Sequence, residues 1–307
     1  MTVISVQDLH KRYGDHPAVD GVGFQVDAGE VFGILGPNGA GKTTTVECLT
    51  GLRRRDSGRV QVLGLVPEAD RAALAPQIGV SLQTSTLPDR IRVGEAVELF
   101  RSFYPDPADT GELLERLGLA PARRQRWSTL SGGQQQRLAV AFALVGRPRV
   151  AVLDELTTGL DPQARREVWD LVRAERDRGV TVVLVTHFME EAQALCDRVA
   201  LIDAGRVTAI GSPGELVDSL AAAQQLRLRV ADPFDRALLA DLPEVSRVEV
   251  VPSDGGSLVT VDGTGDVVLA VTYRLARLGI AARDLRVHQS TLDDAYVTLT
   301  APQGARS

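Results

Sequence analysis

The sequence contains very little lysine, few cysteines and no long apolar run. Only two of its 34 basic residues are lysines, Lys11 and Lys42, and the 307 residues carry a formal net charge of −6. No basic run is longer than Arg53 to Arg55, so we expect no nucleic-acid partner. The longest apolar run, Leu138 to Val145, is too short to span a bilayer, and the N-terminus lacks a leader-like pattern. Neither a transmembrane segment nor secretion is therefore predicted.

The two cysteines, Cys48 and Cys196, do not form a metal-binding spacing or a disulfide framework. We expect both to be small buried apolar residues. Apolar residues make up 44% and charged residues 24% of the chain, which is typical of a globular protein. This composition excludes disordered, collagen-like and disulfide-scaffold classes.

Strand-like and helical segments alternate along the first 215 or so residues. Short continuous apolar runs at 31–35, 150–153 and 180–185 are typical of strands buried on both faces of a mostly parallel sheet. A helix is predicted over 43–49, and Asp161-Pro162 opens another. The pattern predicts an α/β fold.

Two regions depart from this alternation. Residues 84–145 contain no strand candidate and predict an inserted helical subdomain. Beyond a seam near residue 220 the pattern changes to a βαββαβ order, which predicts a small α+β, ferredoxin-like domain over 220–307 after a first domain over 1–219. Its predicted strands and helical stripe are 224–230, 245–250, 257–261, 285–288 and Val268, Val271, Leu275 and Leu278.

A glycine-rich segment after the first of these strands matches the pattern G-x-x-x-x-G-K-[ST]. Its glycines let backbone N–H groups turn around phosphate oxygens at the start of a helix. Lys42 would supply a positive charge to the outer phosphates, and the Thr43 hydroxyl would bind Mg²⁺. Because lysine is so rare here, a chance match is improbable. The predicted nucleotide-binding residues of this loop are Gly36, Pro37, Asn38, Gly39, Ala40, Gly41, Lys42, Thr43 and Thr44.

Two acidic residues end a second apolar segment, where Val150 to Leu153 is followed by Asp154 and Glu155. A buried strand of a parallel sheet delivers its last residues to the ligand-binding edge. An acid pair after a strand often only begins a helix. Together with a phosphate loop, it predicts that Asp154 holds Mg²⁺ and that Glu155 orients or deprotonates a water aimed at the γ-phosphate.

Between these two motifs, the segment Leu130-Ser-Gly-Gly-Gln134 opens a helical run and resembles the signature of ATP-binding cassette (ABC) ATPases. Other elements of that family stand in the same order along residues 1 to about 220. Tyr13 resembles the aromatic residue that stacks on adenine, and Gln83 resembles the Q-loop glutamine. Asp161 lies in a segment similar to the D-loop, and His187 resembles the switch histidine.

The resemblance implies a P-loop NTPase cassette and a site made by two copies of the chain. The cradle at Ser131, Gly132, Gly133 and Gln134 would close on the ATP held by another copy's phosphate loop, giving a head-to-tail homodimer around two ATP. Asp161 would join this nucleotide site. His187 would contact the γ-phosphate, and Gln83 would link Mg²⁺ and water to the helical insertion. The chain departs from the family at Leu156, where proline is usual, and the turn that carries Glu155 is expected to be less rigid.

The chain further resembles the ATPase subunits of ABC-2-type exporters, and specifically the daunorubicin-resistance group. The segment from Thr291 to Thr300 is similar to the end of that group's appended domain, although it also reads as a capped amphipathic helix. This resemblance implies a subunit of an exporter, of the kind associated with antibiotic resistance, that acts from the cytoplasmic face of the cell membrane, with the chain bound peripherally to a separate integral membrane permease. The permease would dock near Ser85 to Arg92.

Three other classes deserve comparison with the exporter subunit. A cassette ATPase acting on ribosomes or DNA is the main alternative, although such members generally carry two cassettes or long coiled coils, which this sequence lacks. A GTPase would need an N-K-x-D motif, and neither Lys11 nor Lys42 lies in one. A small-molecule kinase would leave the Ser131 segment unexplained. The cargo is not indicated by the sequence, and the second domain could serve dimerisation, regulation or partner selection.

Overall fold

The structure, a computed structural model, describes residues 1–81, 87–218, 224–253, 256–288 and 291–300. The chain divides into two compact units, Met1–Pro213 and Gly214–Ser307. Each unit has its own hydrophobic core.

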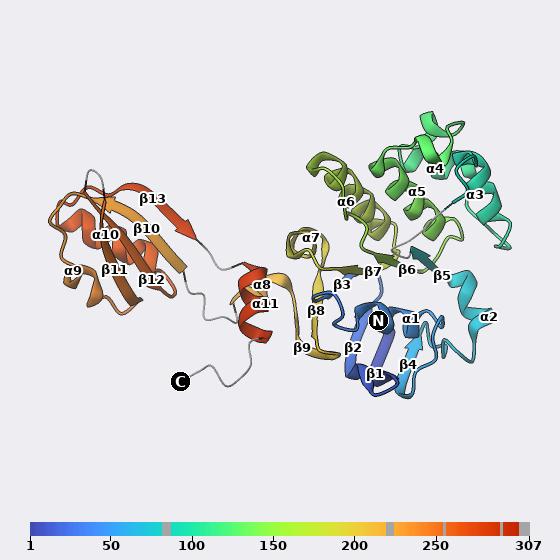
Figure 1. Ribbon diagram of the computed structural model, residues 1–307, viewed down its shortest axis with the longest axis horizontal. Coiled ribbons are helices and arrows are strands. Elements are labelled where there is room, and N and C mark those ends of the chain that lie inside the picture. Colours follow the sequence, from blue (N-terminus) through green and yellow to red (C-terminus); the bar gives the residue numbers. More distant parts are fainter. Residues whose placement is uncertain (82–86, 219–223, 254–255, 289–290, 301–307) are drawn as a thin grey trace. The chain divides into compact units, whose positions relative to one another are not determined.

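A six-stranded sheet forms the centre of the first unit (Figure 1). Its strand order is β5-β6-β7-β3-β8-β9, in which the first five strands are parallel and β9 is antiparallel to β8. Every residue of β3, β6 and β7 is buried, as expected for strands covered on both faces. The predicted α/β class with a mostly parallel sheet is confirmed. The strands are β3 (Val31–Leu35), β5 (Ile78–Ser81), β6 (Val150–Asp154), β7 (Thr181–Thr186), β8 (Arg198–Asp203) and β9 (Arg206–Gly211).

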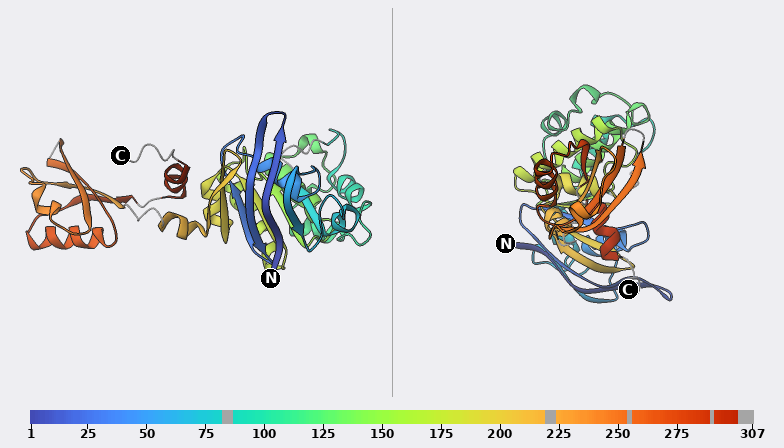
Figure 2. Two further views of the ribbon diagram at one scale, coloured as in Figure 1. Left: turned by 90° about the horizontal axis from the view of Figure 1, so that it is seen from below. Right: turned by 90° about the vertical axis from the view of Figure 1, so that its left-hand side faces the viewer.

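A separate antiparallel sheet with the order β2-β1-β4 belongs to the same unit. Its strands are β1 (Thr2–Tyr13), β2 (His16–Asp27) and β4 (Ser57–Val62), and Figure 2 shows the long β1–β2 hairpin in blue. The two sheets share one core, in which Phe24 of β2 stacks on Phe32 of β3 with ring centroids 5.1 Å apart. The sequence pattern did not separate this sheet from the main one, because periodicity reports which face is buried and not which strand is the partner.

Helices follow the strands of the central sheet. α1 (Lys42–Leu49) comes directly after the loop that leaves β3, α6 (Pro162–Asp177) follows β6, and α7 (Met189–Leu195) follows β7. The short α2 (Arg71–Leu74) and η1 (Ala75–Gln77) precede β5. The starts of α1, α6 and α7 therefore gather at the carboxyl edge of the parallel strands, where ligands of α/β proteins bind.

The described elements between β5 and β6 are all helical. They are α3 (Val93–Arg101), α4 (Thr110–Arg116), η2 (Ala120–Ala122), η3 (Trp127–Thr129) and α5 (Gly132–Leu144). Helix α5 lies directly on β5, because a Cβ added at Gly79 would come within 1.7 Å of the Ala143 carbonyl oxygen. Phe100 of α3 stacks on Phe142 of α5 with ring centroids 4.0 Å apart.

Ion pairs join these helices to α6. The Arg116 Nη2 lies 2.5 Å from both carboxylate oxygens of Glu175, which is buried, and Arg178 Nη1 lies 3.1 Å from Glu175 Oε1. A second pair joins Arg137 of α5 to Glu167 of α6 at 3.3 Å. The helix after β6 is thus tied to the helical insertion by charge as well as by packing.

The second unit contains an antiparallel sheet with the order β11-β12-β10-β13. Its strands are β10 (Gln224–Val230), β11 (Val245–Ser253), β12 (Gly256–Gly263) and β13 (Arg283–His288), and the helices are α8 (Pro213–Asp218), α9 (Ala237–Ala240), α10 (Val267–Arg277) and α11 (Leu292–Thr300). The β10–β13 segment contains the predicted βαββαβ order. One expectation within it is wrong, because Leu278 is not part of the buried stripe. It ends α10 and is 46% exposed, whereas Val271 and Leu275 pack in the core.

Candidate functional site

The predicted phosphate loop and Glu155 line one cavity of about 470 Å³ at the carboxyl edge of the central sheet. Ala18 of β2 contributes to its wall, and this residue was not predicted because no local sequence pattern links β2 to the loop. The loop and helix residues that line the cavity are Asn38, Gly39, Gly41, Lys42, Thr43 and Thr44. The structure thus brings together two motifs more than one hundred residues apart in the sequence.

Two glycines of the loop are required by close packing of the backbone. A Cβ at Gly36 would lie 2.1 Å from the Ile202 carbonyl oxygen, and one at Gly41 would lie 2.2 Å from the Ala18 carbonyl oxygen. Gly41 also has a φ of 98°, in the left-handed region that favours glycine. Strands β2 and β8 therefore hold the loop from outside, and its concave side remains open to the cavity.

Lys42 is buried at the base of this loop. Its Nζ donates hydrogen bonds to the carbonyl oxygens of Gly36 at 2.8 Å and Pro37 at 2.9 Å. Burial lowers the pKa of Lys42, while the nearby carboxylates of Glu155 and Asp154 act in the opposite direction. The loop therefore holds a positive charge at the cavity, partly withdrawn from water, where its attraction for a phosphate is strongest.

Asp154 and Glu155 lie at the end of β6, as predicted for the acid pair. Asp154 is 4% exposed, and burial together with the charge of Glu155 raises its pKa to about 6. Glu155 has a φ of 49°, an uncommon left-handed conformation, and its backbone N–H donates to the Val185 carbonyl oxygen at 2.8 Å. The next residue, Leu156, is fully buried. The turn thus ends with a buried hydrophobic side chain and places the Glu155 carboxylate at the cavity.

His187 lies directly after β7 and contacts this turn. Its Nδ1 is 3.1 Å from Glu155 Oε1, so the histidine and the glutamate form one pair. The carboxylate can orient the imidazole ring and leave Nε2 available to a ligand, which is the arrangement that hydrolytic sites use to fix a histidine. The structure therefore joins the two residues that the sequence analysis placed at the γ-phosphate.

A second group of predicted residues lies outside the cavity lining. Ser131 caps α5, its Oγ accepting from Gln134 N at 3.3 Å and its N–H donating to Gln134 Oε1 at 2.9 Å. Asp161 caps α6, its Oδ1 accepting from Gln163 N and Ala164 N. A Cβ built at Gly133 would lie 3.1 Å from the Ala164 Cβ, so the starts of the two helices are neighbours. Ser131 and Gly132 are exposed.

The remaining predicted residues are Tyr13, Gln83 and Ser85. Tyr13 ends β1 away from the cavity lining and is 42% exposed, with the Arg53 guanidinium 5.1 Å from its ring centroid. Gln83 and Ser85 lie outside the described residues. Gln136 was not predicted, yet its Nε2 donates to the Glu155 carbonyl oxygen at 3.4 Å. It connects α5 to the Glu155 turn at the cavity. Its position, two residues beyond the predicted Gln134, was the sequence feature that could have indicated this role.

The described residues contain no group of three or more His, Cys, Asp or Glu side chains able to hold a metal ion by themselves. Mg²⁺ at a phosphate site needs only one or two protein ligands, because phosphate oxygens and waters supply the rest. The Thr43 hydroxyl and the buried Asp154 carboxylate are oxygen donors of the required type. The donor set therefore fits Mg²⁺ bound together with a nucleotide.

Comparison with known proteins decides the family. The pattern of the family described as "ABC transporter" matches residues 19–158. The Nod factor export ATP-binding protein I of Ralstonia nicotianae is 43% identical over 313 residues, covering 97% of this chain and 94% of that protein. The chain belongs to the ABC transporter family. The daunorubicin resistance ATP-binding protein DrrA3 of Streptomyces coeruleorubidus is 38% identical over 315 residues, covering 97% and 96%.

Solved structures agree with this assignment. A dimeric post-hydrolysis state of an ATP-binding cassette bound to ADP and phosphate has a TM-score of 0.62 at 26% identity, covering 68% of this chain and 98% of that one. The structure of cbiO1 from Clostridium perfringens, part of the ABC transporter complex cbiONQ, has a TM-score of 0.63 at 28% identity, covering 71% of this chain and 92% of that one. The ABC cassette is therefore an ATP-binding and ATP-hydrolysing subunit, as expected. None of the helices described by the structure is long and apolar enough to cross a membrane.

Proposed function

We propose that two copies of this ABC cassette close head to tail around two ATP and power export through a separate membrane permease. The separation of the predicted site into two groups carries the proposal. The phosphate loop and Glu155 line one cavity and His187 contacts Glu155, whereas the exposed cradle at Ser131 is not part of that cavity lining. A second copy that presents its Ser131 cradle would complete the site, and a cassette of similar fold bound to ADP and phosphate is dimeric.

The residues of the phosphate loop and of the segments around Glu155 and His187 then have separate roles in hydrolysis. Lys42 and the backbone N–H groups of the loop bind the phosphates, and His187, oriented by Glu155, donates to the γ-phosphate. Glu155 positions the attacking water and accepts its proton. Bound through Thr43 and Asp154, Mg²⁺ would neutralise phosphate charge. In the closed pair, Ser131 and the first N–H groups of α5 supply a second anion-binding helix start.

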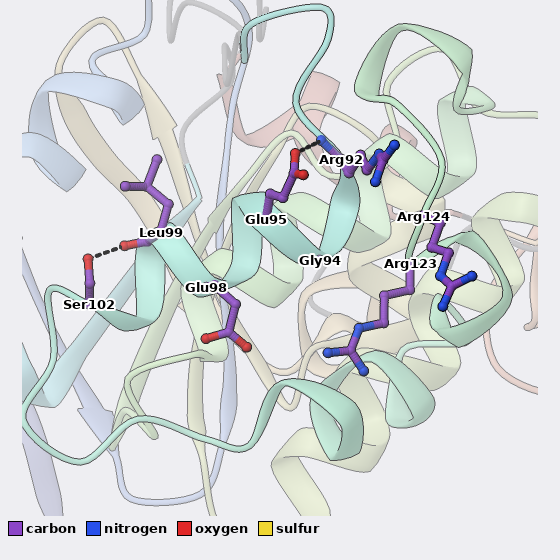
Figure 3. Close-up of a pocket in the computed structure, with 8 residues that line it drawn as sticks. All are labelled: Arg92, Gly94, Glu95, Glu98, Leu99, Ser102, Arg123 and Arg124. Atoms are coloured by element: carbon purple, nitrogen blue, oxygen red, sulfur yellow. Dashed lines mark hydrogen bonds between the residues drawn. The ribbon is translucent and has the colours of Figure 1, made fainter.

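The proposed coupling to the permease involves the helical insertion. A groove of about 610 Å³ lies between α3 and the chain after η2, and Figure 3 shows Arg123 and Arg124 reaching from the loop that faces α3. It begins at Arg92, where the predicted docking segment ends. Glu95 is held to the start of α3 through the Arg92 N–H. The proposed occupant of this groove is a short segment of the permease.

Export is supported by the relatives, and the cargo is not specified by the cassette. Proteins named for Nod factor export and for daunorubicin resistance are 43% and 38% identical to this chain. Because similar cassettes serve such different cargoes, the cargo must be selected by the permease. We further propose that the chain lies on the cytoplasmic side of the membrane, bound to that permease.

The test is affinity purification of tagged Glu155→Gln from detergent-solubilised native membranes with Mg-ATP. The variant should bind ATP, turn over no ATP and accumulate as a closed dimer by light scattering, because only the water-activating group is removed. A polytopic membrane protein should co-purify in roughly equal amount. The Lys42→Ala chain serves as the control that cannot close. Recovery with ribosomal or DNA-repair proteins, or a monomer with and without ATP, would overturn the proposal.

A further inference from the structure

Glu191 is a buried carboxylate that the catalytic roles above do not use. It lies on α7, four residues after His187, and is 1% exposed. Its Oε1 accepts hydrogen bonds from Thr157 Oγ1 at 2.9 Å and from Trp169 Nε1 at 3.2 Å. Its Oε2 is buried and has no hydrogen-bond partner among the residues that the structure describes. The side chain does not line the nucleotide cavity.

Packing alone does not explain a carboxylate at this position. Glu191 shares the buried side of α7 with Ala192 and Leu195, where an apolar residue would fill space without a desolvation cost. Withdrawing a carboxylate from water costs several kcal/mol unless hydrogen bonds offset it. The two donors on Oε1 offset part of that cost, and the unpartnered Oε2 does not. The two hydrogen bonds that offset this cost also connect Glu191 to residues of other segments.

The two donors to Glu191 are Thr157 and Trp169, which lie on the chain that follows Glu155. Thr157 is two residues beyond Glu155, on the turn that leads to Asp161, and is itself fully buried. Trp169 lies on α6, the helix that Asp161 caps. The Glu155 turn and the His187 segment are therefore joined twice, by the Glu155–His187 pair and by the Thr157–Glu191 hydrogen bond. The left-handed φ of Glu155 requires such restraint from its surroundings.

We propose that Glu191 is a positioning residue for ATP hydrolysis. It fixes the turn that carries Glu155 relative to His187 and directs the chain that continues to Asp161. This proposal rests on the proposed roles of Glu155 and His187. It adds the interaction that keeps these two side chains at a productive separation. Because effective catalysis depends on placement within a fraction of an ångström, a loosened turn should lower turnover without weakening nucleotide binding.

The test compares steady-state ATP hydrolysis and nucleotide affinity for Glu191→Ala, Glu191→Gln and Thr157→Val. We expect Glu191→Ala to lower kcat roughly 10- to 100-fold with an unchanged Kd for ATP. Glutamine retains an acceptor at Oε1, so Glu191→Gln should recover most of the turnover. Thr157→Val removes one donor without changing side-chain shape and should lower kcat less. Adding Thr157→Val to Glu191→Ala should have no further effect, because Glu191→Ala already removes the acceptor of the Thr157 hydroxyl.

The matched control is Glu190→Gln on the same helix, whose carboxylate is 73% exposed and pairs with Arg165 at 3.1 Å. It should leave kcat and Kd unchanged. If Glu191→Ala fails to fold, Thr157→Val decides the outcome. A wild-type chain that hydrolyses ATP, together with folded Glu191→Ala or Thr157→Val chains of unchanged kcat and lower melting temperature, would show a purely structural role and overturn the inference. A wild-type chain without ATP turnover would instead overturn the proposed function.

Discussion

At the scale of single residues, the nucleotide cavity concentrates charge that is poorly solvated. Asp154 and Lys42 are both nearly inaccessible to water, and burial shifts the pKa of each toward its neutral form. Such sites are costly to the folded chain until a ligand supplies the complementary charge. The same burial strengthens every electrostatic contact with a bound phosphate or cation. The cavity therefore exchanges some stability for affinity.

This exchange predicts that Asp154→Asn stabilises the chain without nucleotide. A pKa of about 6 against an ordinary 3.8 corresponds to a cost of about 3 kcal/mol for keeping the carboxylate ionised at neutral pH. Part of this cost remains for a buried amide, so we expect a net gain of about 1 kcal/mol, or roughly 2–4 °C in melting temperature. Calorimetry without nucleotide checks it. The exposed Asp89→Asn should change nothing, and an equal shift in both variants would contradict the explanation.

The two lysines of the chain provide a matched pair for a second prediction. Lys42→Ala should weaken ATP binding about 100-fold or more, because a buried ammonium at the phosphate loop contributes several kcal/mol to anion binding. Lys11→Ala should leave binding unchanged, since Lys11 pairs with Asp56 at 2.6 Å outside the cavity lining. Isothermal titration with ATP measures both. Equal affinity of wild type and Lys42→Ala would mean that the phosphate loop is wrongly assigned.

At the scale of elements, the features that could be predicted are those recognised from residues adjacent in the sequence. The strands at 31–35 and 150–153 and the helix opened by Asp161-Pro162 were predicted, because apolar runs and helix caps are recognised from adjacent residues. The sheet β2-β1-β4 was not, since strand partnership is not local. The site divides in the same way. Its loop and acid pair were found as motifs, whereas Glu191 was not found because its partners lie 34 and 22 residues away.

The ion pair between Arg116 of the helical insertion and Glu175 of α6 leads to a prediction at this scale. Arg116→Ala leaves Arg178 as the one basic partner of the buried Glu175 among the residues that the structure describes, and we expect a loss of about 2–3 kcal/mol in unfolding free energy. Arg147→Ala breaks an exposed pair with Asp106 and should cost well under 1 kcal/mol. Urea denaturation compares the two. Similar losses for both would show that Glu175 does not depend on the insertion for its charge balance.

At the scale of the whole molecule, the chain combines a complete cassette with a second, independent core. The cavity, the Ser131 cradle and the groove along α3 all lie in the unit Met1–Pro213. Their hydrophobic core draws on strands and helices of that unit alone. The second unit has its own sheet and the helix α10, whose Leu269 and Tyr273 are 67% and 63% exposed. Among the residues that the structure describes, none that lines the cavity belongs to the second unit.

This separation predicts that a chain ending at Asp218 folds, binds ATP and hydrolyses it within about twofold of the full chain, because distant sites without shared partners act independently. ATP titration and steady-state turnover of the two chains check the prediction. Lost turnover in a folded short chain would mean that the second unit contributes to the active dimer. Intact turnover with loss of the co-purifying membrane protein would instead assign the second unit to partner selection. If the short chain keeps both its ATP turnover and the co-purifying membrane protein, regulation of the cassette would be the remaining role of the second unit. Neither hydrolysis nor docking would then depend on that unit.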